Sequence, residues 1–338
     1  MRLLIGAAAR GRPEQYGKEV AAALPAELYD VSLSFDLGDH SDKWGAELAT
    51  TEAVILTSRG IGPEAIERAR ELRFVQKLGV DVDRVDLDAC RRRGIQVSVL
   101  PDAGHVAVAE HSIALALAGT RNLISTHGAV VRKENPQGLQ VIRTTQEKRH
   151  VNWLKRPEMD FPLAADLTLG LIGFGEIARE VARRASALFA RIIYTKRRRL
   201  DVQTERQYDV EFMNLDDLLT NSDVVSLHAT QPDGAMPIIG ARELGVIKKG
   251  AFFINTARGN QVDQRALIET LRTGSLRGAA LDVFETEPEF DDALLGLPNV
   301  ILTPHTANLM PTGRRFQEAL ANVAAVRCGR AVSGLVVG

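Results

Sequence analysis

Three ionisable residues in separate segments of the chain have the chemistry needed to act on a carbonyl that neighbours a carboxylate. Arg258 lies in the run Asn-Thr-Ala-Arg-Gly, Glu287 in the run Asp-Val-Phe-Glu-Thr-Glu-Pro, and His305 closes the run Thr-Pro-His. A guanidinium can clamp a carboxylate through two hydrogen bonds and polarise the adjacent carbonyl. An imidazole can donate a proton to the carbonyl oxygen, or accept it in the reverse direction, and a glutamate can hold that imidazole in place.

Each of these residues has an ordinary alternative when it is considered alone. Arg258 could form a surface salt bridge, His305 could be structural, and Glu287 is one of 43 acidic residues. The segments 252–255 and 300–302, which precede Arg258 and His305, are predicted to be strands. Because ligands bind at the carboxyl ends of the strands in doubly wound sheets, the ordered set predicts one catalytic edge.

A glycine-rich turn upstream predicts a dinucleotide site. The strand-like segment 168–172 leads into the pattern G-x-G-x-x-A, and a helix is expected over 178–189. Gly173 allows the tight turn, and Gly175 lets the backbone approach a pyrophosphate that the helix N-terminus stabilises. The contacts expected from this turn are Gly173, Phe174, Gly175, Glu176 and Ile177.

The next predicted strand, 191–195, ends in a way that favours NADP over NAD. NAD-selective sites usually carry Asp or Glu there to accept the ribose hydroxyls. Here the strand ends at Thr195 and continues into Lys196, Arg197, Arg198 and Arg199. Cations without a carboxylate suit a 2′-phosphate, although a basic run can also be an ordinary solvated loop. NADP(H) is therefore favoured, and NAD(H) stays possible.

The elements around these motifs predict an α/β protein with two Rossmann-like, doubly wound parallel-sheet domains. In the first hundred residues we expect strands at 3–5, 53–56, 74–78 and 95–99, with helices at 63–71 and 85–92. A long helix is expected over 101–123, and 130–162 is expected to be a helix followed by a surface excursion. A second series of strands is expected at 168–172, 191–195, 224–228, 251–255, 278–282 and 300–302.

The last predicted helix, 313–326, is expected to pack back on the first domain and make that domain discontinuous. The expected domains are 1–100 with about 306–338 for substrate binding, and 101–305 for the dinucleotide. The second of these includes a helix and arm at about 104–160.

Composition narrows the class of protein. The chain has 338 residues, with 42 Lys and Arg against 43 Asp and Glu, and this balance argues against nucleic-acid or membrane-surface binding. Two cysteines cannot form a disulfide framework, so a reducing compartment is expected. No signal peptide is evident, and the longest apolar stretch is too short and too polar to span a bilayer. We expect a cytoplasmic protein, and we assign no metal site.

The motifs together resemble the D-isomer-specific 2-hydroxyacid dehydrogenase family over nearly the whole chain. The resemblance includes the segment 78–80, the run Val-Ala-Glu-His at 108–111, the glycine turn, and the segments 255–263, 282–288 and 303–305. It implies a catalytic triad of Arg258, Glu287 and His305, and a cleft between two Rossmann-like domains. It also implies a homodimer, with the helix near Val106 and the arm after it at the interface.

The resemblance implies further site residues. Backbone amides of Leu78, Gly79 and Val80 would hold the substrate carboxylate together with Arg258, and Asp282 would contact the nicotinamide carboxamide. His228, Thr256 and Ala257 are also expected in the cofactor site. Some relatives that reduce glyoxylate or hydroxypyruvate use NADPH, which suits the basic strand end. The expected function is thus reduction of a 2-ketoacid, or oxidation of a D-2-hydroxyacid in reverse.

Departures from the family pattern weaken the choice of substrate. The substrate loop, usually Gly-Val-Gly, reads Gly79-Val80-Asp81, and His305 is followed by Thr-Ala-Asn. A formate or phosphite dehydrogenase on the same scaffold is an alternative. Glu287 argues against the formate type and Val80 against the phosphite type. A dinucleotide-sensing regulator that is not an enzyme is the other alternative.

Overall fold

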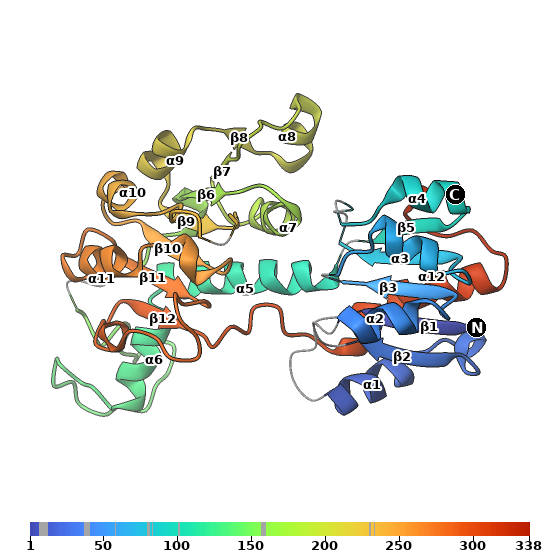
Figure 1. The fold of residues 1–338 in the computed structure, drawn as a ribbon. Coiled ribbons are helices and arrows are strands. Elements are labelled where there is room, and N and C mark those ends of the chain that lie inside the picture. The colour runs from blue at the N-terminus through green and yellow to red at the C-terminus, as the bar shows by residue number, and fades with distance from the viewer. Residues whose placement is uncertain are drawn as a thin grey trace. The chain divides into compact units, whose positions relative to one another are not determined.

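The computed structural model describes residues 1–6, 13–36, 41–57, 59–79, 82, 84–100, 102–156, 160–229, 231–232 and 234–338. The chain divides into two compact units (Figure 1). Unit 1 comprises Met1–His105 with Leu309–Gly338, and unit 2 comprises Val106–Asn308. Each unit contains a largely or wholly parallel sheet with helices on both faces, so the predicted α/β fold class is confirmed.

The described part of unit 1 contains a six-stranded sheet in the order β13-β5-β4-β3-β1-β2. Its strands are β1 (Arg2–Gly6), β2 (Ser32–Asp36), β3 (Ala53–Leu56), β4 (Phe74–Leu78), β5 (Gln96–Leu100) and β13 (Leu335–Val337). The first five run parallel in a 2-1-3-4-5 order, which is a doubly wound arrangement. The short strand β13 joins the edge antiparallel to β5.

Helices bury both faces of this sheet, as the apolar strand sequences require. They are α1 (Pro13–Ala22), α2 (Ser41–Leu48), α3 (Pro63–Arg68), α4 (Leu87–Arg93) and α12 (Thr312–Arg327), with a 3-10 turn η1 (Ala26–Leu28). On one face α1 and α12 pack Val20, Phe316 and Leu320 against Leu3 and Ile5. On the other face α2, α3 and α4 pack against the same strands.

Unit 2 contains a seven-stranded parallel sheet in the order β12-β11-β10-β9-β6-β7-β8, counted over its described residues. The strands are β6 (Thr168–Ile172), β7 (Arg191–Thr195), β8 (Glu211–Phe212), β9 (Val224–Leu227), β10 (Phe252–Asn255), β11 (Gly278–Leu281) and β12 (Val300–Leu302). If the strands of unit 2 are numbered 1 to 7 along the chain, their order from β8 to β12 is 3-2-1-4-5-6-7. This is the 3-2-1-4-5-6 order of a Rossmann fold with one strand added. Its strand order reverses between β6 and β9, directly beside the glycine turn.

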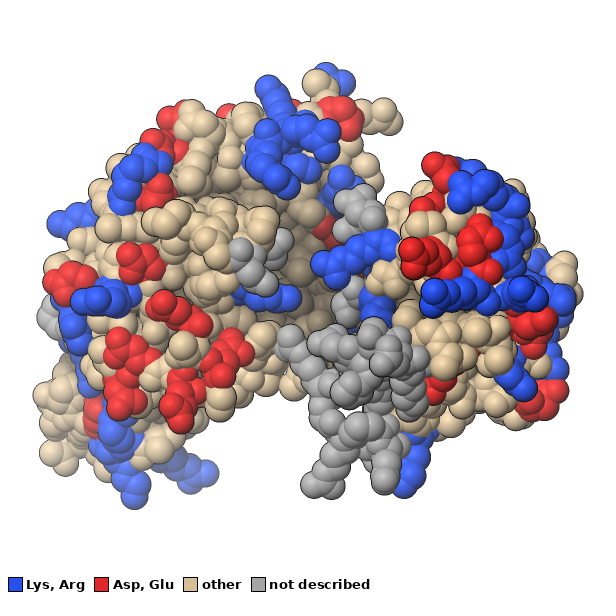
Figure 2. Space-filling view, in the orientation of Figure 1, with Lys and Arg blue, Asp and Glu red and all other residues tan. Residues whose placement is uncertain are grey.

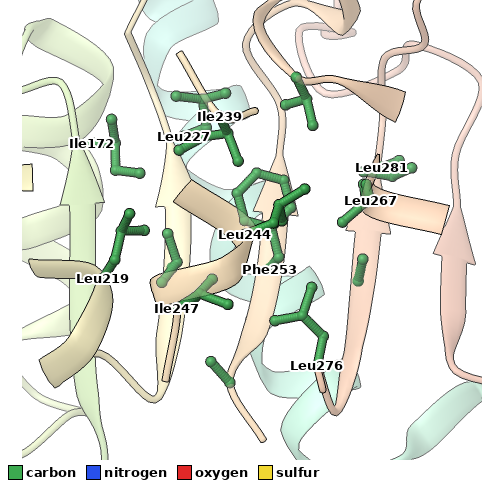
Figure 3. Packing of buried hydrophobic residues seen from close by; sticks show 14 of the residues in the cluster. Ile172, Leu219, Leu227, Ile239, Leu244, Ile247, Phe253, Leu267, Leu276 and Leu281 are labelled. Carbon is green, nitrogen blue, oxygen red and sulfur yellow. The ribbon is translucent and has the colours of Figure 1, made fainter. Parts of the chain in front are cut away.

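Two groups of helices cover the faces of the unit 2 sheet. They are α5 (Ala103–Thr120), α6 (Leu123–Val131), α7 (Glu176–Ala185), α8 (Val202–Tyr208), α9 (Leu215–Asn221), α10 (Ala241–Val246) and α11 (Gln264–Arg272), with 3-10 turns η2 (Ala164–Asp166), η3 (Gly259–Gln261) and η4 (Asp292–Leu294). Helices α5, α7 and α8 pack on one face. On the other, α9, α10 and α11 contribute to a cluster that includes Leu244, Phe253 and Leu267 (Figure 3).

The region after α5 departs from the prediction. Instead of one helix over 101–123, the chain forms α5 and α6, separated at Asn122, whose φ of 50° cannot continue a right-handed helix. A helix beginning near residue 130 was expected, but α6 ends at Val131, and the described residues 132–156 and 160–163 contain no helix. This expectation was wrong because the apolar helical residues lie before 130, while Pro136 and Gly138 follow.

Among the residues that the structure describes, no helix is both long enough and apolar enough to cross a membrane.

Candidate active site

Arg258, Glu287 and His305 lie in the loops that follow three adjacent strands of unit 2. Strands β10, β11 and β12 are hydrogen-bonded neighbours and run parallel, so their carboxyl ends share one edge of the sheet. The loop after β11 is hydrogen-bonded to the loop after β12, and it packs closely against the loop after β10 at Gly259. The topology therefore brings together the three residues that the sequence places up to 47 positions apart (258 to 305).

His305 occupies an unusual backbone conformation at the end of a tight turn. Its φ is 55°, in the left-handed region, and its N–H donates to the carbonyl of Thr303 at 3.0 Å. Non-glycine residues adopt this conformation at a cost of about 1–3 kcal/mol, and such positions cluster at functional sites. The turn projects the imidazole toward Glu287, with His305 Nδ1 2.6 Å from Glu287 Oε2.

Glu287 holds the imidazole while it is itself held by the backbone. Its Oε1 accepts the N–H of Phe284 at 3.1 Å, which leaves Oε2 directed at His305. Engaging Nδ1 in this way leaves Nε2 as the ring nitrogen that can serve a bound molecule. Both side chains are partly open to solvent, at 25% for His305 and 34% for Glu287. His305 is therefore an accessible acid-base group whose orientation is fixed by Glu287.

Asp282, the first residue after β11, anchors the turn that carries His305. The carboxylate is fully buried. Its Oδ1 accepts the Thr303 hydroxyl at 2.6 Å and the Thr306 N–H at 2.8 Å, and Oδ2 accepts the Ala307 N–H at 2.9 Å. In the structure Asp282 therefore positions His305, and its expected contact with a carboxamide stays a prediction.

Arg258 is an exposed cation without an acidic partner in the part of the chain that the structure describes. Its Nη1 donates to the carbonyl of Ala257 at 2.7 Å, and no carboxylate among those residues pairs with it. Asn255 fixes the loop below it, because its side chain accepts the N–H of Ala257 and donates to the carbonyl of Arg258. A salt bridge was the alternative role for Arg258, and these contacts leave the guanidinium available for an anion instead.

The glycine turn has the shape that a pyrophosphate requires. Gly173 has a φ of 89°, and a Cβ there would lie 2.6 Å from the backbone nitrogen of Ala229. Gly175 begins α7 without a side-chain cap, and a Cβ added to it would meet no atom within 4 Å. Open space therefore adjoins the N–H groups at the start of α7, where an anion is stabilised. The residues present fit a dinucleotide phosphate.

The basic strand end lies against this turn. Gly173 donates its N–H to the carbonyl of Thr195 at 2.9 Å, and Lys196 Nζ donates to the carbonyl of Phe174 at 3.3 Å. Burial lowers the pKa of Lys196, and the charges of Arg179 and Arg198 lower it further. Figure 2 shows Lys and Arg side chains gathered over α7 and α8, the part of unit 2 that contains this strand end.

The remaining expected cofactor residues are placed near the same edge. His228 follows β9, and its Nε2 lies 2.9 Å from the Ser226 hydroxyl. Burial lowers the pKa of His228 to about 4, so its imidazole is neutral at pH 7. Thr256 and Ala257 are buried, and the Thr256 hydroxyl is engaged with that of Ser112 at 2.9 Å. Thr256 can therefore offer a ligand its backbone more readily than its hydroxyl.

Comparison with known proteins bears directly on this arrangement. Residues 138–307 match the family model described as D-isomer specific 2-hydroxyacid dehydrogenase, NAD binding domain. A glyoxylate reductase of Pyrococcus furiosus is 35% identical over 273 residues, which cover 80% of this chain and 76% of that protein. The chain belongs to the D-isomer-specific 2-hydroxyacid dehydrogenase family. The family resemblance drawn from the sequence motifs is confirmed.

Solved structures agree with this membership of the 2-hydroxyacid dehydrogenase family. The crystal structure of the TT0316 protein from Thermus thermophilus is 31% identical, with a TM-score of 0.66 over 100% of both chains. A glyoxylate reductase from Paecilomyes thermophila is 25% identical, with a TM-score of 0.66 over 99% of this chain and 98% of that one. This 2-hydroxyacid dehydrogenase is an enzyme of the oxidoreductase class.

The expected substrate loop of the dehydrogenase lies in unit 1, directly after β4. Gly79 has a φ of 95°, and its N–H donates to the carbonyl of Leu100 at 2.8 Å, which extends the β4–β5 pairing. That amide already has an acceptor, which argues against its holding a substrate carboxylate as expected. Leu78 is buried, and its amide contact stays a prediction. Val80 and Asp81 lie outside the described residues.

Two residues of α5 support the catalytic loops, and sequence reasoning gave them no such role. His111 Nε2 lies 3.2 Å from the Thr303 hydroxyl and 3.6 Å from Asp282 Oδ1, so it packs against the turn of His305. Ser112 meets Thr256 in the loop of Arg258. The run Val-Ala-Glu-His, part of the family resemblance, indicated a role for this helix in the site. The contacts of His111 and Ser112 could not be predicted from it, because they depend on tertiary packing.

Gly259 is required where two catalytic loops of the dehydrogenase cross. A Cβ at Gly259 would lie 1.7 Å from the carbonyl oxygen of Phe284, between the loops of Arg258 and Glu287. We expect Gly259→Ala to destabilise unit 2 by about 1–3 kcal/mol or more and to lower kcat/KM, because the loops must separate. Gly296→Ala is the matched control, since a Cβ there meets no atom within 4 Å. Thermal unfolding and steady-state kinetics of both variants measure the effect, and equal behaviour of the two would contradict the packing argument.

Proposed function

We propose that this dehydrogenase reduces a small 2-ketoacid of the glyoxylate or hydroxypyruvate type to the D-2-hydroxyacid, with NADPH preferred over NADH. The observation that carries the proposal is the 2.6 Å contact between His305 Nδ1 and Glu287 Oε2, on the same sheet edge as Arg258. Similarity to the Pyrococcus furiosus glyoxylate reductase supports the substrate class. The reverse reaction would oxidise the D-2-hydroxyacid.

Arg258 is proposed to recognise the 2-ketoacid. A planar guanidinium matches a carboxylate through two parallel hydrogen bonds, and from that position it also polarises the neighbouring carbonyl. The exposed side chain has only a backbone carbonyl as a partner among the described residues, so binding an anion does not require breaking an ion pair. The same cation would stabilise negative charge as it develops on the carbonyl oxygen.

His305 is proposed to move the proton. In reduction its imidazolium donates a proton from Nε2 to the carbonyl oxygen, and in oxidation the neutral ring takes a proton from the hydroxyl. Glu287 keeps the ring in one orientation and balances the charge of the protonated form. A nicotinamide dinucleotide, when bound, supplies or accepts the hydride at the carbon atom.

The cofactor preference rests on charge at the end of β7. No acidic residue directly follows Thr195, where it would accept a hydrogen bond from a ribose hydroxyl or repel a 2′-phosphate, and Lys196, Arg197 and Arg198 lie there instead. Gly173 and Gly175 are proposed to receive the pyrophosphate at the start of α7. Unit 2 would thus be the dinucleotide-binding unit and unit 1 the substrate-binding unit.

We also propose a homodimer formed through α6 and the segment that follows it. Several large apolar side chains are exposed there, including Leu123 at 57%, Val131 at 65% and Val151 at 72%. Exposed apolar side chains that gather on one element indicate a contact surface more often than a solvated one. A second copy of the chain is the proposed partner.

Turnover with a panel of 2-ketoacids tests the proposed activity. With purified protein, glyoxylate, hydroxypyruvate and longer 2-ketoacids are expected to drive oxidation of NADPH, with a higher kcat/KM than with NADH. The measurement is the loss of reduced nicotinamide absorbance, with formate and phosphite assayed in the oxidative direction beside a D-2-hydroxyacid. Binding of NADPH without turnover of any ketoacid would defeat the substrate proposal. Equal kcat/KM values with the two cofactors would defeat the cofactor preference alone.

A further inference from the structure

We propose that Arg179, in the first turn of α7, forms with Lys196 the seat of the 2′-phosphate of NADP(H). Cofactor specificity would then depend on a helix residue that lies outside the basic run 196–199. The inference deepens the proposed function, because it rests on the NADPH preference stated there. It names a residue that neither the glycine pattern nor the strand end indicates.

The position of Arg179 is fixed at the glycine turn. Its N–H donates to the carbonyl of Gly175 at 3.0 Å, so the residue sits one helical turn from the open space beside that glycine. Its guanidinium carbon lies 5.7 Å from the centre of the Tyr208 ring on α8, and the side chain is half-buried. The stacking holds the cation on the side of α7 that faces α8 and the end of β7.

Lys196 approaches the same place from the strand. Its Nζ donates to the carbonyl of Phe174, inside the glycine turn, at 3.3 Å. Burial and the nearby charges of Arg179 and Arg198 lower the pKa of Lys196. Arg179 thus acts electrostatically on Lys196 even though the two residues are 17 positions apart in the sequence (179 to 196). Like charges brought together beside a turn that fits a phosphate favour an anion between them.

Neighbouring arginines of the same helix differ from Arg179 in their partners. Arg183 and Arg184 share the carboxylate of Glu180, and Arg184 also lies 3.8 Å from Glu110, so each of these two arginines has a carboxylate partner. Among the residues that the structure describes, no carboxylate pairs with Arg179. Helix α7 therefore directs only its first arginine, the one at the glycine turn, toward an outside anion.

The arginines of the basic run after β7 also differ in whether a carboxylate pairs with them. Arg199 is engaged by Glu205 through two hydrogen bonds of 2.8 Å, and Glu205 also accepts the Tyr194 hydroxyl at 2.7 Å. Arg198 is exposed, and it has no carboxylate partner in the described part of the chain. The cations left for a ligand are thus those nearest the glycine turn. A ribose hydroxyl is uncharged and gains little from them, whereas a phosphate dianion gains a charge-assisted bond from each.

Binding of two adenosine nucleotides that differ only in the 2′-phosphate tests the role of Arg179 without turnover. Calorimetric titration of the wild-type enzyme is expected to give tighter binding of 2′,5′-ADP than of 5′-AMP. Arg179→Gln is expected to weaken 2′,5′-ADP binding about tenfold, or about 1.4 kcal/mol, and to leave 5′-AMP binding unchanged. Arg179→Lys should recover part of the loss. The matched control is Arg183→Gln, because Arg183 also lies over the Tyr208 ring, at 5.6 Å, but is paired with Glu180.

The outcomes separate this inference from the function on which it rests. If the wild type prefers 2′,5′-ADP and Arg179→Gln retains the full preference, the role of Arg179 is overturned and the NADPH preference stands. If Arg179→Gln weakens both ligands equally, the residue only supports the fold of the turn, and the inference is again overturned. Equal binding of both ligands by the wild type would overturn the inference together with the NADPH preference. Reduction of a ketoacid is measured separately and does not enter these titrations.

Discussion

Replacement of His305 by alanine is expected to lower kcat by about 10²–10⁴-fold, the usual contribution of a positioned acid-base group. The imidazole is the only group that the proposed mechanism assigns to proton transfer, and its 2.6 Å contact with Glu287 fixes it for that purpose. Because the glycine turn and the strand end lie elsewhere on the sheet edge, binding of NADPH should be unchanged. Steady-state kinetics with glyoxylate and a separate cofactor titration measure the two effects.

A second variant distinguishes proton transfer from simple damage to the turn. Glu287→Gln keeps one side-chain oxygen, which can accept from either the Phe284 N–H or the His305 ring, whereas the carboxylate serves both with its two oxygens, and the substitution removes the negative charge. Its kcat should fall less than that of His305→Ala, because the imidazole that transfers the proton is retained while only its counter-charge is lost. An unchanged kcat in His305→Ala would refute the acid-base assignment. Loss of NADPH binding in that variant would indicate that the turn had collapsed instead.

Most of the fold could be predicted because its strands are buried on both faces. An apolar run such as 53–56 identifies a strand of a parallel sheet, and the helical segments between successive strands indicate parallel connections. Strand β2 (Ser32–Asp36) was not predicted, since an edge strand with alternating polar residues has a weak signal. Strand β13 was missed for a different reason. It has three residues, and the preceding Ser333 carbonyl is held by Asn322 and by Ser98, which is 235 positions away in the sequence.

A common sheet edge for Arg258 and His305 could be predicted for a topological reason, and Glu287 was expected to hold the imidazole, whereas most other side-chain contacts could not be predicted. Arg258 and His305 each follow a strand, and parallel strands place such residues on one edge whatever their separation. Partners depend on distances between side chains that only the folded chain determines. Arg199 belongs to the same basic run as Arg198, yet it is committed to Glu205. The contact of Asp282 with the nicotinamide carboxamide stays a prediction, while its bonds to the turn of His305 were not predicted from the sequence.

Replacement of Arg258 by alanine is expected to impair both substrate binding and the chemical step. Loss of a charge-assisted contact with the substrate carboxylate, worth about 1.5–3 kcal/mol, should raise the KM for glyoxylate by about 10–100-fold. Loss of a donor that stabilises developing charge on the carbonyl oxygen should lower kcat by about 10²-fold. The KM for NADPH should stay close to that of the wild type. Initial rates measured over a matrix of ketoacid and cofactor concentrations separate these quantities.

Substitution of Arg258 should change the kinetics without changing the stability of the fold. Its side chain is exposed and contacts the carbonyl of Ala257, while Asn255 holds the loop through backbone groups that alanine retains. The melting temperature of Arg258→Ala should therefore equal that of the wild type within about 2 °C, because exposed substitutions of this kind change stability little. Arg258→Lys keeps the charge but loses the planar fork, so it should recover part of the ketoacid KM and little of kcat. A wild-type KM and kcat in Arg258→Ala would show that the carboxylate is held elsewhere, and full recovery by lysine would show that charge alone is sufficient.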